Sequence, residues 1–212
     1  MPALTETRRQ VRARETRAKI FEAATDLIAQ QGYHATSVDR IAARAGVAKA
    51  TFFVHFASKA EIIAALMRIQ AATAREARAK ALPEGPIAAL RAMVESLGRL
   101  AAKSRTLSRG VLAATLESEE IGGAASALFD EVLAEMTADA HAAQKADLLA
   151  PGVEPDTLAS SLLASYFGAL LTASHKPKAD MRAVLASLID ATLRGACRSA
   201  VQSGLPRARG FR

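Results

Sequence analysis

An all-α fold is predicted by three features of the 212-residue sequence. Half of the residues are hydrophobic, but only 4% are aromatic and none is tryptophan, so small aliphatic side chains must fill the core. Such alanine- and leucine-rich composition favours packed helices. Apolar residues also recur every three or four positions, and no segment has the two-residue alternation of a half-buried strand. The length allows one large domain or two modest ones.

Apolar stripes separated by turn signals predict about nine helices. Gly32 ends the first, a capping-box spacing at Thr36 starts the second, Gly46 separates the second from the third, and a full capping box at Ser58 starts the long fourth helix. The expected helices cover about 8–31, 37–44, 48–54, 59–80, 87–100, 107–116, 124–149, 156–174 and 179–201.

Prolines and glycines separate the later helices. "LPEGPI" at 82–87 is the clearest break, "ESEEIGG" at 117–123 stops the sixth helix, and Pro177 interrupts "SHKPKAD". The run from Thr157 to Ser174 carries no charge, but it contains serines and is shorter than the roughly 20 residues that span a bilayer. We therefore expect a buried bundle helix there and not a membrane span.

The charge distribution indicates an anionic partner. Net charge is +7. Residues 6–19 contain six basic residues, from Arg8 to Lys19, and only two acidic ones, Glu6 and Glu15. A second basic group, Arg207 to Arg212, closes the chain, and solvated tails are the simpler interpretation of that group. The N-terminus has no apolar run typical of a signal peptide, which predicts a cytoplasmic protein.

The sequence gives little indication that the protein is an enzyme. The four histidines are scattered, no cysteine or carboxylate cluster has the spacing of metal ligands, and there is no glycine-rich phosphate loop. The single Cys197 fits a reducing compartment and is expected in the core or at a subunit contact, with redox sensing as the less favoured alternative. We expect no enzyme, metal or cofactor.

Two short helices joined by a tight glycine turn have the geometry of a helix-turn-helix, whose second helix enters the DNA major groove. The run "GYHATSVDRIAARAGVAKATFFVHFASKAEII", residues 32–63, resembles the DNA-binding motif of the TetR family of bacterial transcriptional regulators. Its matching features are Gly32-Tyr33, Thr36, Ile41-Ala42, Ala45-Gly46-Val47, Thr51, His55-Phe56, Ser58-Lys59 and Ile62-Ile63.

The resemblance implies a homodimeric regulator, usually a repressor, whose grip on DNA changes when a small molecule enters a C-terminal helical domain. The expected organisation is a basic N-terminal arm (1–13), a DNA-binding domain (14–74) with its helix-turn-helix at about 37–56, a helical regulatory and dimerisation domain (75–203) and a basic tail (204–212). Two alternatives stay open: an effector-independent regulator that works through a protein partner, and a helical carrier or interaction protein whose arm meets membrane or RNA.

Residues of the motif supply the expected contacts with double-stranded DNA. Lys49 can bind a base edge or a phosphate, and Thr51 a phosphate or a thymine methyl group. His55 and Lys59 lie where the family contacts the DNA backbone, and Arg44 could reach a phosphate or remain a solvated surface residue, as could Arg40. The candidate DNA-binding residues are Thr36, Arg44, Ala48, Lys49, Ala50, Thr51, Phe53, His55 and Lys59.

Three positions depart from the family pattern. Ala48 replaces a serine or threonine that caps the recognition helix, Ala50 replaces a glycine, and Phe53 replaces a tyrosine whose hydroxyl binds a phosphate. We hypothesise that the arginines at 8–17 compensate for these missing groups by becoming ordered on DNA.

The second half of the chain offers two further sets of candidates. An apolar or aromatic effector, in preference to a sugar or polyanion, is expected among Met93, Leu97, Leu112, Thr115, Leu116, Phe129, Leu133, Tyr166 and His175, although each could equally be ordinary core. The dimer interface expected from the family architecture comprises Leu158, Leu162, Ser165, Tyr166, Ala169, Leu185, Leu188 and Thr192.

Overall fold

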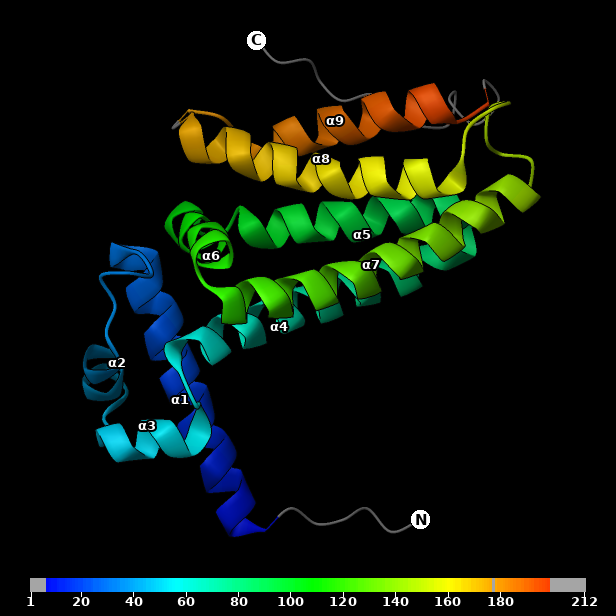
Figure 1. Ribbon diagram of the computed structural model, residues 1–212. Helices are drawn as coiled ribbons and strands as arrows, with labels where there is room; N and C mark the ends of the chain where they lie inside the picture. The colour runs from blue at the N-terminus through cyan, green and yellow to red at the C-terminus, as the bar shows by residue number, and fades with distance from the viewer. Residues whose placement is uncertain (1–6, 177, 199–212) are drawn as a thin grey trace. The chain divides into compact units, whose positions relative to one another are not determined.

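The computed structural model describes residues 7–176 and 178–198, and these residues form an all-α fold (Figure 1). The helices are α1 (Arg8–Gln31), α2 (Val38–Ala45), α3 (Lys49–His55), α4 (Lys59–Ala81), the 3-10 helix η1 (Leu82–Glu84), α5 (Pro86–Ala101), α6 (Arg105–Glu117), α7 (Glu119–Lys145), α8 (Pro155–His175) and α9 (Met181–Ala196). The predicted helical fold and the limits of the first helix are confirmed.

Three predicted helix ends were wrong. α7 starts at Glu119 and not at 124, because the Ser118 hydroxyl accepts a hydrogen bond from Ile121 N and the two glycines that follow are tolerated within the helix. α7 ends at Lys145, since Asp147 has a left-handed φ of 56°. α9 ends at Ala196, where Cys197 leaves the helix and pairs in an isolated bridge with Leu149.

The chain divides into two compact units. The first comprises the described residues up to Ala65 together with Thr106–Gly122, and the second comprises Leu66–Arg105 together with the described residues from Gly123 onward. This division falls inside α4, earlier than residue 74, and it adds α6 to the first unit. Gly110 explains the addition, because a Cβ atom there would lie 3.2 Å from Ile28 Cγ2 of α1.

The core of the first unit joins α1 to the three helices that follow it. Side chains from α1, α2, α3 and α4 are removed from water together, at roughly 25 cal/mol for each Å² of apolar surface buried. The buried cluster consists of Ile20, Ala23, Ala24, Leu27, Ile41, Ala42, Phe52, Phe56 and Ile62. It fixes the positions of the two short helices, neither of which would be stable alone.

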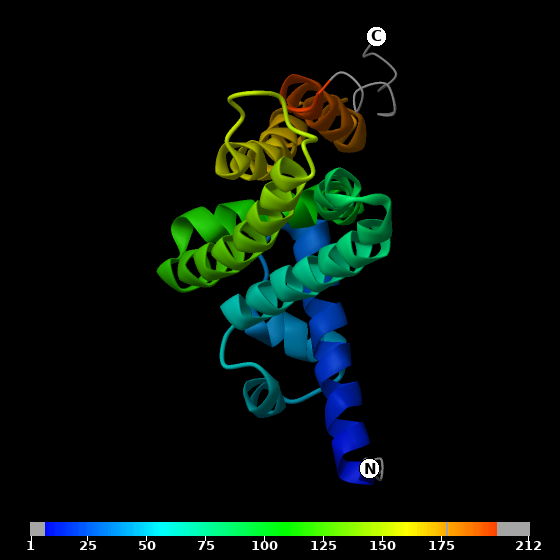
Figure 2. The ribbon, with the colours of Figure 1, turned by 90° about the vertical axis from the view of Figure 1, so that its right-hand side faces the viewer.

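In the second unit, α5 packs against both α8 and α9, and α8 and α9 lie side by side (Figures 1 and 2). Gly98 allows the close approach of α5 to α9, because a Cβ atom there would lie 2.2 Å from Leu185 Cδ2. Leu158 and Leu162 of α8 are buried, so this apolar helix belongs to the bundle core, although its length and composition alone would allow a membrane span.

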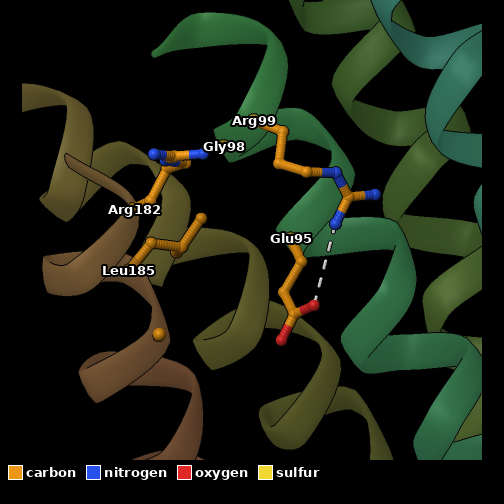
Figure 3. Close-up of a pocket in the computed structure, with 6 residues that line it drawn as sticks. Glu95, Gly98, Arg99, Arg182 and Leu185 are labelled. Atoms are coloured by element: carbon orange, nitrogen blue, oxygen red, sulfur yellow. Dashed lines mark ion pairs between the residues drawn. The ribbon is translucent and has the colours of Figure 1, made fainter. Parts of the chain in front are cut away.

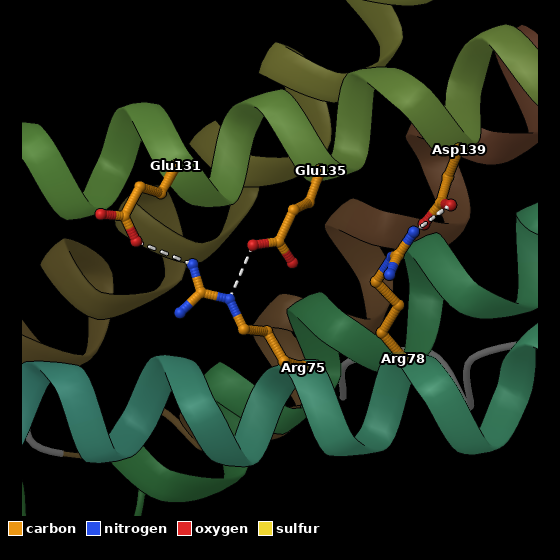
Figure 4. A network of polar contacts seen from close by, with 5 residues as sticks. All are labelled: Arg75, Arg78, Glu131, Glu135 and Asp139. Atoms are coloured by element: carbon orange, nitrogen blue, oxygen red, sulfur yellow. Dashed lines mark hydrogen bonds and ion pairs between the residues drawn. The ribbon is translucent and has the colours of Figure 1, made fainter.

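Arginine–carboxylate pairs fasten the C-terminal half of α4 to α7 (Figure 4). Arg78 donates two hydrogen bonds to the buried carboxylate of Asp139, at 2.6 and 2.7 Å. Arg75 binds Glu135 at 2.7 Å and Glu131 at 3.0 Å. These bonds raise the pKa of both arginines, so the guanidinium groups stay charged.

Candidate nucleic-acid interface

α2 and α3 form a helix-turn-helix whose turn depends on one glycine. Gly46 has φ 68° and ψ 34°, a left-handed conformation that costs other residues about 1–2 kcal/mol. The amide groups of Gly46 and Val47 donate hydrogen bonds to the carbonyl oxygens of Ala43 and Ala42, at 3.2 and 3.0 Å respectively. These bonds satisfy the end of α2 and set the direction in which α3 leaves it.

α3 presents opposite faces to the core and to solvent. Phe52 and Phe56 are buried, with ring centroids 6.0 Å apart, and they hold α3 on the core. Ala48, Lys49, Ala50, Phe53 and Val54 are exposed. Thr51 and His55 are half-buried at the edge of the exposed face. Val54 was not among the predicted contact residues, although its helical position opposite Phe52 and Phe56 could have identified it.

Two of the exposed cations of the motif, Lys49 and Arg44, are held by carboxylates. Lys49 Nζ lies 2.9 Å from Asp39 Oδ1 at the start of α2, and Arg44 lies 3.2 Å from Asp26 Oδ2 of α1. Both pairs are solvent-exposed, so each contributes about 0–1 kcal/mol and can open when a phosphate competes for the cation. The two carboxylates therefore orient Lys49 and Arg44 without binding them tightly.

Thr36, one of the predicted contact residues, has another role in the structure. Thr36 is fully buried and its hydroxyl donates to Gly32 O at 2.8 Å, so its side chain does not reach solvent. The cap of α2 is the next residue, Ser37, whose hydroxyl accepts from Arg40 N at 3.3 Å. The expectation that the Thr36 side chain caps α2 or touches DNA is corrected.

Lys59 holds the turn between α1 and α2. Its ammonium group donates to Tyr33 O at 2.7 Å and Thr36 O at 2.8 Å, and it lies 3.9 Å from the centroid of the Tyr33 ring. Burial lowers the pKa of Lys59. A charge used in this way inside the unit is not available to a phosphate, so the side-chain contact predicted for Lys59 is not supported.

Arg17 is a structural residue that sequence reasoning placed in the basic group of the N-terminus. Its guanidinium group donates to the carbonyl oxygen of His55, lies 3.9 Å from the Phe56 ring centroid, and pairs with Glu61 at 3.5 Å. It thereby fastens α1 to the end of α3 and the start of α4. The long separation in sequence, 38 residues from Arg17 to His55, hid this contact.

The caps of α3 and α4 match the expectations from the sequence. Ala48 occupies the cap position of α3 and makes no side-chain hydrogen bond there. Before α4, the Ser58 hydroxyl accepts from Glu61 N at 3.1 Å, and the Glu61 carboxylate accepts from Ala57 N at 2.6 Å. The start of α4 is thus well capped, whereas the start of α3 is not.

The basic start of α1, which we define as Arg8, Arg9 and Arg12, is helical and exposed. Thr7 caps the helix, accepting from Gln10 N at 3.3 Å, while the Gln10 side chain accepts from Thr7 N at 2.8 Å. Residues 8–13 are therefore already ordered as part of α1, which corrects the interpretation of 1–13 as an arm. Residues 1–6 and the predicted basic tail at 204–212 lie outside the described residues.

The predicted effector residues are distributed over both units. Leu112, Thr115 and Leu116 belong to the first unit, and the other six belong to the second. Leu116 and His175 are exposed to solvent, which argues against an enclosed site at these two positions. Within the second unit, the Phe129 and Phe167 rings lie 5.8 Å apart, and burial raises the pKa of neighbouring Tyr166 to about 12.

Most predicted dimer residues face the interior of their own chain. Burial leaves them no surface to offer a partner, which corrects their assignment; these residues are Leu158, Leu162, Ser165, Ala169 and Leu185. The outer surface of the helix pair carries the predicted Leu188 together with Phe167 and Leu171, which were not among the predicted dimer residues, and all three are exposed. A Cβ atom at Gly168 would lie 3.7 Å from Leu188 Cδ1, so α8 and α9 meet beside this surface.

A pocket of about 270 Å³ lies between α5 and α9 (Figure 3). Gly98, Leu185 and Ala186 contribute its small and apolar lining, and the charged side chains of Glu95, Arg99 and Arg182 surround them. Glu95 pairs with Arg91 at 3.3 Å and with Arg99 at 3.8 Å. Of the lining residues, only Leu185 was predicted to belong to a functional surface.

Comparison with known protein sequences finds similarity in the N-terminal part of the chain. Residues 20–66 match the family model described as bacterial regulatory proteins, tetR family. The HTH-type transcriptional activator FasR of Mycolicibacterium smegmatis is 41% identical over 54 residues, which cover 26% of this chain and 25% of FasR. The chain thus matches about a quarter of the length of that curated relative.

Solved structures match over much more of the chain. SmeT, the repressor of the Stenotrophomonas maltophilia multidrug efflux pump SmeDEF, is 25% identical with a TM-score of 0.72, over 87% of this chain and 92% of SmeT. A gamma-butyrolactone receptor, an ArpA-like protein, is 27% identical with a TM-score of 0.64, over 91% of this chain and 93% of the receptor. The similarity therefore extends through both units.

Proposed function

The chain belongs to the tetR family of bacterial regulatory proteins, and from this premise we propose that it is a dimeric, sequence-specific DNA-binding repressor released by a small apolar effector. The observation that carries the proposal is the solvent-exposed outer face of α3, presented by a glycine turn and flanked by Lys49, Arg44 and the basic start of α1. A helix so placed can enter the major groove while the cations contact phosphates.

The test is selection of bound fragments from genomic DNA with the purified protein. A dimer whose two α3 helices contact successive major grooves requires two half-sites about 34–36 Å apart, so a palindromic motif is the expected product. The regulated genes adjoining the motif would also indicate the effector. Recovery of unrelated fragments in proportion to their abundance would reject sequence-specific binding.

A charge reversal on α3 separates DNA binding from the alternative of a helical carrier or interaction protein. Lys49→Glu places a second acid beside Asp39 at the DNA-facing surface and should abolish binding to the selected duplex without dissociating the dimer. Lys80→Glu, at an exposed position in the last turn of α4, is the matched control and should bind as the wild type does. Equal binding by both variants would favour a carrier or interaction protein.

We propose that the dimer forms through the exposed apolar surface of α8 and α9. Phe167, Leu171 and Leu188 leave large apolar side chains in water on two adjacent helices, and a second copy of the chain would bury them symmetrically. Leu171→Glu should halve the mass measured by light scattering. Leu82→Glu, at an exposed leucine of η1, is the control and should leave the mass unchanged; an unchanged mass for Leu171→Glu would place the interface elsewhere.

The effector is proposed to bind in the second unit, beside the Phe129 and Phe167 rings. Met93 and Leu97 of α5 and Leu133 of α7 supply apolar surface in the same unit, which favours an apolar or aromatic compound. A compound present at 100 times its Kd should stabilise the protein by about 2.7 kcal/mol in a thermal-shift screen. The proposal fails if no stabilising compound weakens binding to the selected duplex.

A further inference from the structure

Three neighbouring side chains make the outermost surface of α3 apolar. Val54 is 79% exposed and Phe53 is 49% exposed, and Ala50 lies one helical turn before Val54 on the same face. Phe52 and Phe56 occupy the opposite, buried face. We call Ala50, Phe53 and Val54 the apolar ridge of α3.

The apolar ridge contributes little to the core of its own unit. Phe53 touches the buried Phe52 ring edge-on, with centroids 5.3 Å apart, but about half of its surface remains in water. Val54 has almost all of its side chain in solvent. Covering such apolar surface with a partner is favourable, because it removes the surface from water.

The charges around the ridge indicate a polyanionic partner with apolar groups between its charges. Lys49 lies on the same helix, Arg44 lies in the last turn of α2, and the basic start of α1 belongs to the same unit. In the major groove of DNA, the only apolar group on the base edges is the C5-methyl group of thymine. A valine side chain and an aromatic edge can contact that methyl group, whereas they cannot donate to guanine or accept from cytosine.

We propose that the apolar ridge reads thymine methyl groups, so that each half-site contains thymine opposite Val54 beside the base contacted by Lys49. This inference rests on the proposed function and adds the chemistry of its specificity. Lys49 supplies the only ammonium group on α3, and Asp39 holds it at 2.9 Å on one side of the ridge. Discrimination at the position opposite Val54 then comes from a methyl contact and not from a hydrogen bond.

The experiment replaces thymine by deoxyuridine, one position at a time, in the duplex recovered by fragment selection. Deoxyuridine keeps every hydrogen-bonding group of thymine and removes only the methyl group. Burial of one methyl group corresponds to about a fourfold change in Kd. The wild type should therefore lose about fourfold in affinity at one or two positions of each half-site, measured by fluorescence anisotropy at fixed salt.

Val54→Ala links the effect to the ridge. This variant should bind the thymine and deoxyuridine duplexes equally at the position that Val54 contacts, and its melting temperature should not change because Val54 is exposed. Val54→Thr, which keeps the shape and exchanges one methyl group for a hydroxyl, should show an intermediate penalty. Leu82→Ala, 46% exposed and remote in sequence, is the control and should keep the full wild-type penalty.

The outcomes separate this inference from the proposed function. If the wild type binds the thymine and deoxyuridine duplexes equally, or if Val54→Ala keeps the full penalty, the methyl-reading role is overturned while specific DNA binding stands. A selected half-site without thymine overturns it as well. Failure to select any duplex would instead reject the proposed function.

Discussion

The pairs that join α4 to α7 allow a sharp test, because chemically similar arginines lie at sites of different burial (Figure 4). Asp139 is 4% exposed and receives both of its hydrogen bonds from Arg78, whereas Glu131, a partner of Arg75, is 62% exposed in its side chain. Arg78→Ala would leave a buried carboxylate without its compensating charge. Such a change costs about 3–5 kcal/mol.

Arg75→Ala removes the same kind of group at the more exposed site. Solvent screens Glu131, so this variant should be destabilised by only about 1 kcal/mol. The free energy of unfolding is measured by guanidinium chloride denaturation followed by circular dichroism, with the slope checked for each variant. The double variant Arg78→Met, Asp139→Leu should recover most of the stability, since it removes both charges together.

Equal destabilisation by Arg78→Ala and Arg75→Ala would refute this reasoning. A decrease below about 1 kcal/mol for Arg78→Ala would likewise mean that water reaches Asp139. Because Arg78 and Asp139 lie within the second unit, these results bear on the stability of that unit and on how firmly it holds the C-terminal half of α4.

Three further predictions concern other parts of the chain. Ala48→Ser supplies the missing cap of α3 and should raise the free energy of unfolding by about 1 kcal/mol in the same assay, whereas no gain would mean that the helix start is already satisfied. Exchanging the basic start of α1 for glutamine should reduce the slope of log affinity against log salt by about 0.9 for each phosphate that is no longer neutralised; an unchanged slope would exclude these arginines from the interface. The pKa of Tyr166 is raised to about 12 in the folded state, above about 10 in the unfolded chain, so its contribution to stability is present below pH 10 and disappears as pH rises towards 12. The stability of Tyr166→Phe should therefore fall by about 2 kcal/mol less than that of the wild type between pH 10 and pH 12 in chemical denaturation, and equal decreases would contradict the assigned burial.

Local signals in the sequence predicted the helix-turn-helix well. Gly46 requires a left-handed turn, and the spacing of Ser58 and Glu61 specifies a capped helix start, so neither feature depends on distant parts of the chain. Phe52 and Phe56 are both buried and lie four positions apart, the spacing of one helical face. Such features are readable because they involve residues three or four positions apart.

The failures involve contacts between residues far apart in sequence. Lys59 bonds to backbone oxygens 26 and 23 positions away, and nothing local distinguishes it from a lysine that faces solvent. α8 has apolar residues around most of its circumference, so its sequence does not show which side faces α5 and α9. For that reason Leu162 was assigned to the dimer contact while the exposed Leu171 was omitted.

The central claim is that the outer face of α3 recognises a particular DNA sequence. Its most direct test is the ratio of two affinities, for the selected duplex and for a scrambled duplex of the same composition, measured at one physiological salt concentration. Specific regulators prefer their sites by a factor of about 10³ or more, and we expect a ratio in that range that collapses in Lys49→Glu. A ratio near one for the wild type would contradict the account.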